Sequence, residues 1–567
     1  MYPHRTFHFL EPFKGKLFNG DIPTLAEIFQ IAAARYPDKK CLTTYNPEKF
    51  VLTFREARDK ILTLAASLVE KGVKPGDRVI LTGKNRPEWA VAYYAIATAG
   101  AIIVPLDYTL HEDELKNLID FSEPVAAIVD KEKYDLVKTM LPESAPYYSL
   151  DPAKDGYVLT LENAPLEKPV PREVNDLVAI LYTSGTTGIP KGVMLSNSNL
   201  VNDCFLAQMN MQIYHTDVFY ALLPVHHAYT MLSVLVVGIA QSAEVVFAKR
   251  LVVKELLKDL KDGQITIFLG VPMLFNKLIA NIMKGVRDKG IVLYSIVRFL
   301  MFISGILKKC GIKVGKKLFG KMILDKANLS SIRICISGGG PLPASTFRMF
   351  NQLGLDFVQG YGLTETSPIV TLNPIYHFKV KSVGLVLPEI QVKIINPDKE
   401  GRGEIALKGP TVMQGYYKNP SATDAVMDLN GYFYTGDMGY LDKENFLYLT
   451  GRKKNIIVTA GGKNVFPEEI EDRFQLYNEI EQILVRGYYI DGKKKEAAGE
   501  MIEALIYPSE EMRNSGDPDG IQKKLEEIVN NVNRQLASYM KIARVRVVDQ
   551  PFEESSTKKI KRYKVNA

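Results

Sequence analysis

A loop rich in glycines and hydroxyls stands at residues 181–196, with the sequence LYTSGTTGIPKGVMLS. Gly185 and Gly188 let backbone N–H groups approach an anion closely, and Lys191 supplies a positive charge. Further donors are the hydroxyls of Thr183, Ser184, Thr186 and Thr187. A polyphosphate requires these groups, so we predict a phosphate- or nucleotide-binding loop. The alternative is an ordinary polar surface loop.

The order of residues in this loop excludes the P-loop of nucleoside triphosphatases, which needs Gly-Lys-Ser/Thr at the start of a helix. Here Pro190 precedes Lys191, and Gly192 follows it. Residues 177–182 are mostly apolar and predict a buried strand, while residues 193–195 predict a second one. We therefore expect a turn that connects two strands.

Two further stretches place glycines and polar side chains directly after apolar runs. ISGGGPLP at 336–343 follows a predicted strand, and its glycines would let a flat ring lie against the backbone. These glycines are Gly338, Gly339 and Gly340. VQGYGLTETSP at 358–368 contains the second set: Gln359, Gly360, Tyr361, Gly362, Thr364 and Glu365. The carboxylate of Glu365 is a hard ligand suited to a Mg²⁺ ion that bridges phosphates.

A third stretch, GYFYTGDMGY at 431–440, places Asp437 after a Thr-Gly turn. A carboxylate there could accept hydrogen bonds from both hydroxyls of a ribose. Taken singly, each of the three stretches also fits a plain turn between strands.

Length and composition narrow the class of protein. A chain of 567 residues predicts two to four domains or subdomains, and 46% hydrophobic with 24% charged residues is typical of a globular protein. The net charge of +7, from 71 basic and 64 acidic residues, indicates no nucleic acid partner but suits anionic substrates or an anionic membrane surface. The four cysteines lack CxxC spacing, which predicts neither zinc nor disulfides and favours the cytosol. The N-terminal stretch MYPHRTFHFLEPFKGK predicts no secretory signal.

Strand and helix patterns alternate through most of the first 450 residues, which predicts an α/β fold with largely parallel sheets. The expected strands are 78–81, 126–129, 244–247, 265–269 and 332–336, and the expected helices include 53–71, 87–99 and 112–119. After Gly451 the basic segment GRKKN leads into a smaller α/β unit, with helices at 467–477 and 521–536 and apolar runs at 483–486 and 501–507. We read this unit as a separate C-terminal domain.

The segment at 290–307, GIVLYSIVRFLMFISGIL, carries Arg298 as its single charge, and several lysines follow it up to Lys321. Its length borders on that of a transmembrane helix, but the central arginine and the absence of a second span count against spanning. Two interpretations are equally favoured: a helix on the membrane surface, with basic residues facing anionic lipid, and a buried core helix.

Together and in this order, the stretches resemble the adenylate-forming superfamily of acyl-CoA synthetases, peptide-synthetase adenylation domains and luciferases. The resemblance also includes 76–107 (GDRVILTGKNRPEWAVAYYAIATAGAIIVPLD), LLPVHHAYTM, GEIALKGPTVMQGYYKNP and GRKKNIIVTAGGKNVFPEEIE, and it covers essentially the whole chain. It implies a large N-terminal domain (1–451) of layered α/β sheets with a small β-barrel-like subdomain. A small mobile α+β domain (452–567) would follow, with a hinge near Lys454.

The resemblance also implies roles for individual residues. Residues 183–191 would hold the ATP phosphates, and the three glycines at 338–340 would frame adenine with Tyr361. Thr364 would contact the α-phosphate and Glu365 the Mg²⁺, while Asp437 and Arg452 would bind ribose. His227 aligns with a position lining the acyl pocket, although its neighbour His226 and a core role are alternatives.

The C-terminal stretch PFEESSTKKIKRYKV departs from the usual family pattern, because Lys558 stands where a glycine is expected. Lys559 has the right spacing to Arg562 for the catalytic lysine, and Lys558 is the alternative.

The implied activity is that of a ligase with the substrates ATP, a fatty acid and CoA, and with Mg²⁺. NRPEW, GGKNVFPEEIE and TKKIKR favour bacterial long-chain fatty acyl-CoA synthetases. Only five residues follow Arg562, which counts against a peptide-synthetase module. The alternatives are an acyl-AMP ligase or acyl-carrier-protein synthetase, and a non-catalytic membrane-associated binder. We expect a cytoplasmic protein, with peripheral contact at the inner face of the membrane through 290–321 as an option.

Overall fold

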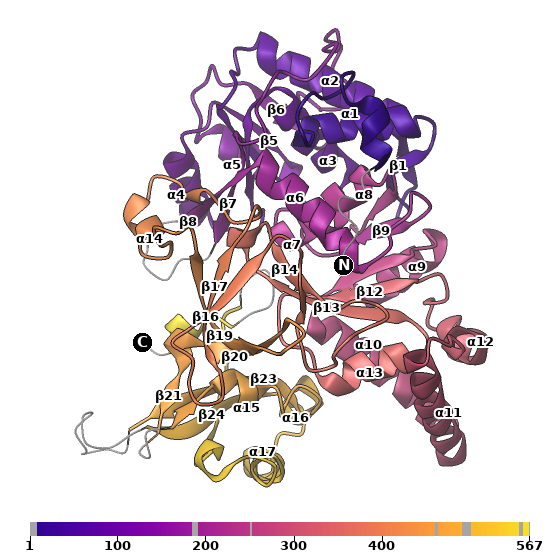
Figure 1. Cartoon of the computed structure of the whole chain (residues 1–567), viewed down its shortest axis with the longest axis vertical. Coiled ribbons are helices and arrows are strands. Elements are labelled where there is room, and N and C mark those ends of the chain that lie inside the picture. The colour runs from indigo at the N-terminus through magenta and orange to yellow at the C-terminus, as the bar shows by residue number, and fades with distance from the viewer. Residues whose placement is uncertain are drawn as a thin grey trace.

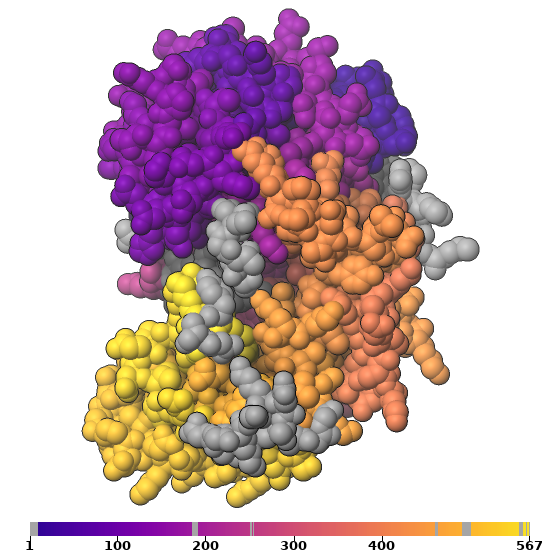
Figure 2. All heavy atoms as spheres, turned by 90° about the vertical axis from the view of Figure 1, so that its left-hand side faces the viewer, coloured from indigo at the N-terminus to yellow at the C-terminus, as the bar shows by residue number. Residues whose placement is uncertain are grey.

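The structure is a computed structural model that describes residues 8–183, 191–249, 252–459, 463–489, 500–554 and 560–565. The described residues form two large sheets and two small ones, with the early helices coloured indigo at the top of Figure 1 and the C-terminal unit in yellow at the bottom. Figure 2 shows the C-terminal unit, in yellow, at the lower left of the molecule and beside the orange segments.

The largest sheet joins a parallel half to an antiparallel half. Its parallel strands are β1 (Lys40–Thr44), β10 (Glu244–Phe247), β9 (Val218–Ala221), β11 (Ile267–Gly270), β12 (Ile334–Ser337) and β13 (Asp356–Gly362), with β2 (Phe50–Thr53) antiparallel at the edge. Its antiparallel strands are β14 (Ile369–Leu372), β15 (Gly384–Val386), β20 (Phe446–Arg452), β19 (Phe433–Leu441), β17 (Gly403–Lys408) and β16 (Gln391–Ile395). This second half is hydrogen-bonded in continuous order with the first, and the expected barrel-like subdomain stays a prediction.

The second sheet contains the strands that flank the phosphate-loop candidate. Its order is β18 (Gly415–Tyr416), β8 (Lys191–Ser196), β7 (Leu177–Thr183), β4 (Ile102–Leu106), β3 (Arg78–Thr82), β5 (Ala126–Val129) and β6 (Tyr147–Ser149). Strands β7 and β8 are antiparallel, and the five strands from β7 to β6 are parallel. The α/β fold is confirmed, but the sheets are mixed rather than largely parallel.

The predicted helices exist with slightly different ends. Thr53 caps α2 (Phe54–Glu70), and its hydroxyl accepts a hydrogen bond from the backbone N–H of Glu56. The next helix, α3 (Pro87–Thr98), is buried along its whole length, because α1 (Leu25–Arg35) and α2 both pack on it. The third, α4, runs over Glu112–Ser122. The other helices of the N-terminal part are α5 (Lys131–Lys138), α6 (Asn197–Ala207), α7 (Ala228–Thr230), α8 (Val237–Ala240), α9 (Val253–Asp262), α12 (Gly315–Phe319), α14 (Pro420–Asp424) and the π-helices η3 (Met231–Val236) and η4 (Gly320–Leu324).

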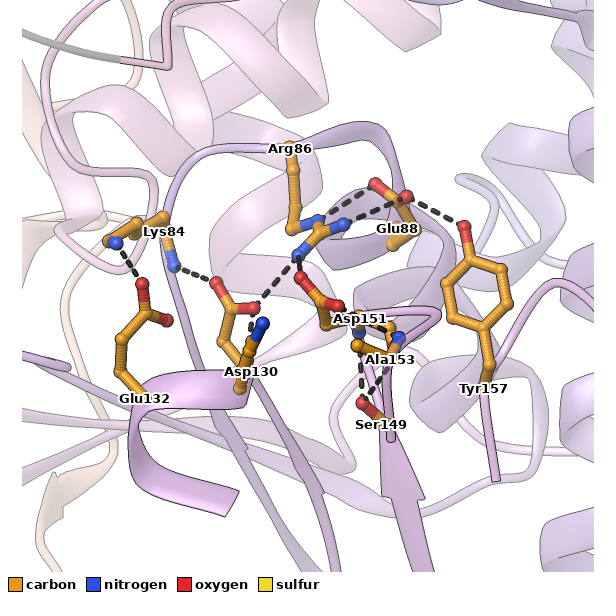
Figure 3. Close-up of polar contacts among 10 residues, drawn as sticks. Lys84, Arg86, Glu88, Asp130, Glu132, Ser149, Asp151, Ala153 and Tyr157 are labelled. Carbon is orange, nitrogen blue, oxygen red and sulfur yellow. Dashed lines mark hydrogen bonds and ion pairs between the residues drawn. The ribbon is translucent and has the colours of Figure 1, made fainter. Parts of the chain in front are cut away.

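A buried ionic network fixes the start of α3 against the smaller sheet (Figure 3). Arg86 pairs with Glu88 at 3.0 Å, with Asp130 at 2.8 Å and with Asp151 at 3.3 Å. The hydroxyl of Tyr157 donates to Glu88 at 2.8 Å. Buried charges need partners of this kind, so we assign the NRPEW segment a structural role at the carboxyl ends of β3, β5 and β6.

The chain after residue 456 builds a small core of its own. The strands β23 (Ile480–Tyr488), β24 (Met501–Pro508) and β25 (Arg544–Val547) form its sheet. The helix α17 runs over Pro518–Asn533 and so begins three residues before the predicted start, with Asp517 as its cap. The helix α15 covers only Pro467–Glu471 instead of 467–477. Short elements complete this part: β21 (Ile457–Val458), β22 (Asn464–Val465) and α16 (Glu510–Arg513).

The apolar segment at 290–307 forms α11 (Ile291–Lys309). Among the described residues it is the one helix long and apolar enough to cross a membrane by length and composition. It packs on α10 (Pro272–Arg287) and α13 (Ala344–Gln352) and projects from the lower right of the molecule in Figure 1. Only 17% of the apolar stretch of this helix is buried, so the interpretation as a buried core helix is wrong.

Candidate active site

The predicted turn after residue 183 does connect two strands, β7 and β8. Thr183 at the end of β7 and Lys191 at the start of β8 are direct cross-strand partners. The intervening candidates, Ser184, Gly185, Thr186, Thr187 and Gly188, lie outside the described residues. Because β7 and β8 pair antiparallel up to Lys191, the strand pairing determines the position of the lysine backbone.

The side chain of Tyr416 connects Lys191 to Glu365. The Lys191 ammonium lies 5.1 Å from the centre of the Tyr416 ring, which is within cation–π range. The Tyr416 hydroxyl donates to Glu365 Oε1 at 2.9 Å. Burial, and then the adjacent Glu365 carboxylate, raise the pKa of Tyr416 far above its usual range, so the phenol keeps its proton and remains a donor. Tyr416 therefore positions two of the predicted site residues.

Sequence reasoning missed Tyr416. It lies in the quoted stretch GEIALKGPTVMQGYYKNP, but no spacing relates it to the 365 or 191 positions. The strand β18 pairs it with Val193 on β8, and this pairing brings it to the site.

A tight turn presents Thr364 and Glu365. The 3-10 helix η5 (Thr364–Thr366) follows β13 directly, and the backbone N–H of Met413 donates to the Glu365 carbonyl at 2.9 Å. A side chain at Gly362 would place its Cβ 1.6 Å from the Pro368 carbonyl oxygen. Only glycine fits there, which explains the Tyr-Gly-Leu-Thr-Glu pattern by backbone packing. Gly360 is less crowded, with 3.0 Å from a Cβ to the Thr371 oxygen.

A second cluster joins Tyr361, Asp437 and Arg452. Asp437 and Arg452 are cross-strand partners on β19 and β20, with Arg452 Nε 2.7 Å from Asp437 Oδ1. The Tyr361 hydroxyl donates to Asp437 Oδ2 at 2.7 Å. Burial, and then the Asp437 carboxylate, raise the pKa of Tyr361 well above its usual range. Both carboxylate oxygens of Asp437 thus have a partner in this structure, and the ribose-binding role of Asp437 and Arg452 stays a prediction.

The glycines at 338–340 follow β12, and Gln359 lies buried next to them on β13. A Cβ at Gly338 would be 2.8 Å from the Tyr229 ring. The Tyr229 hydroxyl donates to the Ile336 carbonyl at 3.3 Å. Gly339 has a φ of +80°, a conformation that favours glycine. Gly338 therefore packs against the ring of Tyr229. Tyr229 is a second residue that sequence reasoning missed.

His227 precedes α7, and its ring centre lies 4.2 Å from that of His226. His226 is buried, with Nε2 3.5 Å from Asp107 Oδ2. Burial disfavours the Asp107 carboxylate, but the adjacent His226 imidazole and the hydrogen bonds from Thr109 outweigh it and hold the pKa of Asp107 well below its usual range. The three side chains offer ligand atoms within 4.8 Å of one another. We interpret the Asp107–His226 contact as packing that positions the neighbouring ring of His227.

The hinge candidate Lys454 stands where both clusters meet the C-terminal unit. Partial burial, and then the cations Arg452 and Lys191, lower the pKa of Lys454, and Arg562 adds to this effect. These three cations therefore lie within electrostatic reach of Lys454. A polyphosphate is the kind of ligand that would offset them.

Lys558 and Lys559 lie outside the described residues, but the chain on both sides is anchored. Glu554 bridges to Ile560, and Arg562 donates to the Val485 carbonyl at 2.9 Å and pairs with Glu471.

Comparison with known proteins adds the family. The model of the AMP-binding enzyme family matches residues 29–417, and that of the AMP-binding enzyme C-terminal domain matches 454–567. The chain belongs to the AMP-binding enzyme family. The predicted membership of the adenylate-forming superfamily is thereby confirmed, as is the expectation of a ligase.

Named relatives agree with this family at modest identity. A long-chain-fatty-acid–CoA ligase of Bacillus subtilis is 28% identical over 507 residues, which cover 82% of each chain. A chloroplastic long-chain-fatty-acid–[acyl-carrier-protein] ligase of Arabidopsis thaliana is 28% identical and covers 93% of this chain and 82% of its own length.

Solved structures have the same fold. The ATP-bound RpMatB-BxBclM chimera B1 superposes with a TM-score of 0.75 at 25% identity, over 95% of this chain and 98% of that one. The o-succinylbenzoate coenzyme A synthetase of Bacillus subtilis, in complex with ATP and magnesium, gives a TM-score of 0.74 at 22% identity, over 95% and 99% of the two chains. In its coarser form, an adenylate-forming acid–thiol ligase, the predicted function is confirmed.

Proposed function

We propose that this enzyme joins a long-chain fatty acid to the thiol of CoA through an acyl-adenylate. The observation that carries the proposal is the convergence of Lys191, Tyr416 and Glu365 with the Tyr361–Asp437–Arg452 cluster around Lys454. The long-chain acid is supported by the names of several relatives, including those from Bacillus subtilis, Mycobacterium tuberculosis and Cavia porcellus.

The first half-reaction needs position and charge rather than a base. A fatty acid carboxylate is ionised at neutral pH and attacks the α-phosphorus of ATP, which releases pyrophosphate. Asp437 and Arg452 would hold the ribose, and the glycines at 338–340 would lie against adenine. Lys191, from the side of β8, and Lys559 would neutralise the charge that develops on the phosphates. In the second half-reaction a thiol attacks the acyl carbon and expels AMP.

Glu365 fits the role of Mg²⁺ ligand. Its carboxylate accepts one hydrogen bond at Oε1 from Tyr416 and keeps further lone pairs for a hard cation. When bound, Mg²⁺ would neutralise charge on the phosphates. Thr364, one residue before it on η5, would contact the α-phosphate.

CoA is our first choice of acceptor, and an acyl carrier protein is the second. The second choice rests on the Arabidopsis thaliana relative, whose printed substrate is an acyl carrier protein. A non-catalytic binder is disfavoured, because the polar residues of both clusters are retained and paired. We place the enzyme in the cytoplasm, where CoA and ATP are available.

The proposal includes two domains, 1–451 and 452–567, that rotate about Lys454 between the half-reactions. The separate core of the C-terminal unit supports this division.

The test measures pyrophosphate release with ATP, Mg²⁺ and acids from acetate to oleate, with and without CoA. Release with long-chain acids and CoA-dependent formation of AMP and acyl-CoA are expected. Adenylate that accumulates despite CoA would favour a carrier-protein acceptor. Release confined to short or aromatic acids would contradict the substrate class.

Variants of the two candidate lysines test the catalytic assignment. Lys559→Ala should abolish adenylation while ATP binding is largely kept, because the lysine acts on charge that develops during the reaction. Lys558→Ala is the matched control. If Lys558→Ala were the damaging change instead, the assignment would be wrong by one residue.

A further inference from the structure

The outward face of α11 is apolar, which is unusual for an exposed helix. Its exposed side chains include Ile291 (60%), Val292 (70%), Ile296 (50%), Phe299 (63%), Phe302 (58%) and Ile306 (49%). At about 100° per residue these positions share one side of the helix. An apolar stripe of this size on a protein surface marks a contact with another molecule or a membrane. We call it the α11 stripe.

The opposite face of α11 is fixed to the protein. Val297, Met301 and Ser304 are buried where α11 packs on α10 and α13. A Cβ at Gly305 would be 2.9 Å from Gln352 on α13, so the helix lies close to its neighbour. The outward direction of the stripe is therefore set by packing on the other side.

The surroundings of the stripe are basic. From Lys289 to Leu324 the sequence contains no Asp or Glu. Arg298 and Lys309 are exposed on α11 itself, and by helical geometry both lie along one edge of the stripe. Lys326 lies close to Lys289 and lowers the pKa of Lys289, because two ammonium groups repel each other. An anion between them would remove this repulsion.

Not every lysine here is available to a partner. Lys308 and Lys313 both pair with Asp356, at 2.9 Å and 2.8 Å, and thus hold the end of α11 against β13. Exposed lysines on the following segment, Lys317 and Lys321, extend the basic surroundings beyond these pairs.

We propose that the α11 stripe docks on a membrane surface that contains anionic phospholipid. The helix, about 28 Å long, lies in the interfacial plane with its aromatic side chains among the acyl chains and its basic edge at the phosphates. Spanning is excluded by the packing of the inner face. A second copy of the chain is a poorer occupant, because a symmetric contact would set one basic edge against another.

Vesicle co-sedimentation tests the proposal directly. The wild-type protein should bind vesicles of phosphatidylcholine with phosphatidylglycerol, and less of it should bind phosphatidylcholine alone. Phe299→Ser with Phe302→Ser should weaken binding to both by ~10-fold or more, since each aromatic ring removed takes apolar area out of the lipid. Lys309→Glu should weaken binding only to the anionic vesicles, and this loss should shrink at high salt.

Matched controls separate the stripe from general surface hydrophobicity. Leu429 and Leu476 are exposed apolar residues on other segments, 107% and 49% exposed. Leu429→Ser with Leu476→Ser should leave vesicle binding unchanged. All variants should melt like the wild type, because the changed side chains face solvent.

Two results would overturn the proposal. One is vesicle binding of the Phe299/Phe302 variant equal to that of the wild type. The other is a wild-type dimer in light scattering that the variant converts to monomer, with vesicle binding the same for both. Vesicle binding is read without substrate, so failure of this proposal is distinguishable from failure of the proposed ligase activity.

Discussion

At the scale of single residues, Tyr416 connects the two charged groups expected to act on ATP. Its ring contacts the Lys191 ammonium and its hydroxyl holds Glu365. A hydrogen bond to a charged group contributes about 1.5–3 kcal/mol, so the phenol is a strong determinant of where the Glu365 carboxylate points.

Tyr416→Phe should therefore raise the Mg²⁺ concentration needed for half-maximal pyrophosphate release and lower kcat/KM by roughly 10-fold or more. The ring under Lys191 is kept, so only the contact with Glu365 is lost. Tyr417→Phe, one residue further, is the matched control and should behave like the wild type. A normal Mg²⁺ profile for Tyr416→Phe would show that Glu365 is positioned by other contacts.

At the scale of elements, the turn from β13 into η5 is where backbone packing presents the site. Gly362 lies against the Pro368 carbonyl, and Leu363 N–H donates to that same oxygen at 3.0 Å. The turn is thus closed on itself immediately before Thr364 and Glu365.

Gly362→Ala should destabilise this turn, because its Cβ would overlap the Pro368 oxygen. We expect a loss of about 2–4 kcal/mol in the free energy of unfolding and little remaining adenylation. Gly285→Ala is the matched control: no atom lies within 4 Å of its Cβ position, and alanine stabilises a helix interior by about 0.5–1 kcal/mol. Urea denaturation measures both, and equal stability of the two variants would contradict the packing argument.

At the scale of the whole molecule, the C-terminal unit contacts the N-terminal part through Gln475. Its side chain donates to the Pro341 carbonyl at 3.2 Å and lies 3.3 Å from the Asn276 amide. The same side chain donates to Asp472 at 2.9 Å. The carboxyl groups of Glu471 and Asp472, close along the chain to Gln475, should make the free energy of unfolding depend on pH.

Burial raises the pKa of Glu471 and of Asp472 to about 7. Because the ordinary carboxyl value is about 4, the folded protein binds more protons than the unfolded chain between about pH 4 and 7. The free energy of unfolding should therefore fall as pH rises through this window. Asp472→Asn should remove about 1–2 kcal/mol of that fall after allowance for solvent screening. Urea denaturation at several pH values checks this, and an unchanged slope would contradict it.

The proposed hinge is tested by a residue that restricts the backbone. Lys454→Pro fixes φ near −65°, so it should keep pyrophosphate release within about twofold but slow thioester formation at least ~10-fold, if rotation precedes only the second step. Lys454→Ala removes the charge without the restriction and is the control. Equal loss of both half-reactions in Lys454→Pro would place the hinge elsewhere.

The sequence by itself determined the fold class, the order of motifs and most elements of the N-terminal part, because apolar periodicity and turn residues act locally. It also predicted the turn between two strands that Thr183 and Lys191 flank, because such a turn depends on neighbours close along the chain. The C-terminal helix limits were less accurate, since Asp517 as a cap and the early end at Glu471 depend on local hydrogen bonds rather than on apolar spacing.

Only the tertiary structure decided the contacts between distant segments. Tyr416 lies 51 residues from Glu365, and Tyr361 lies 76 residues from Asp437, so no local pattern relates them. The same holds for α11: its composition fitted a core helix and a surface helix equally, because both are apolar. Packing against α10 and α13 buries one side and leaves the other in solvent, and this is the physical reason the choice required the fold.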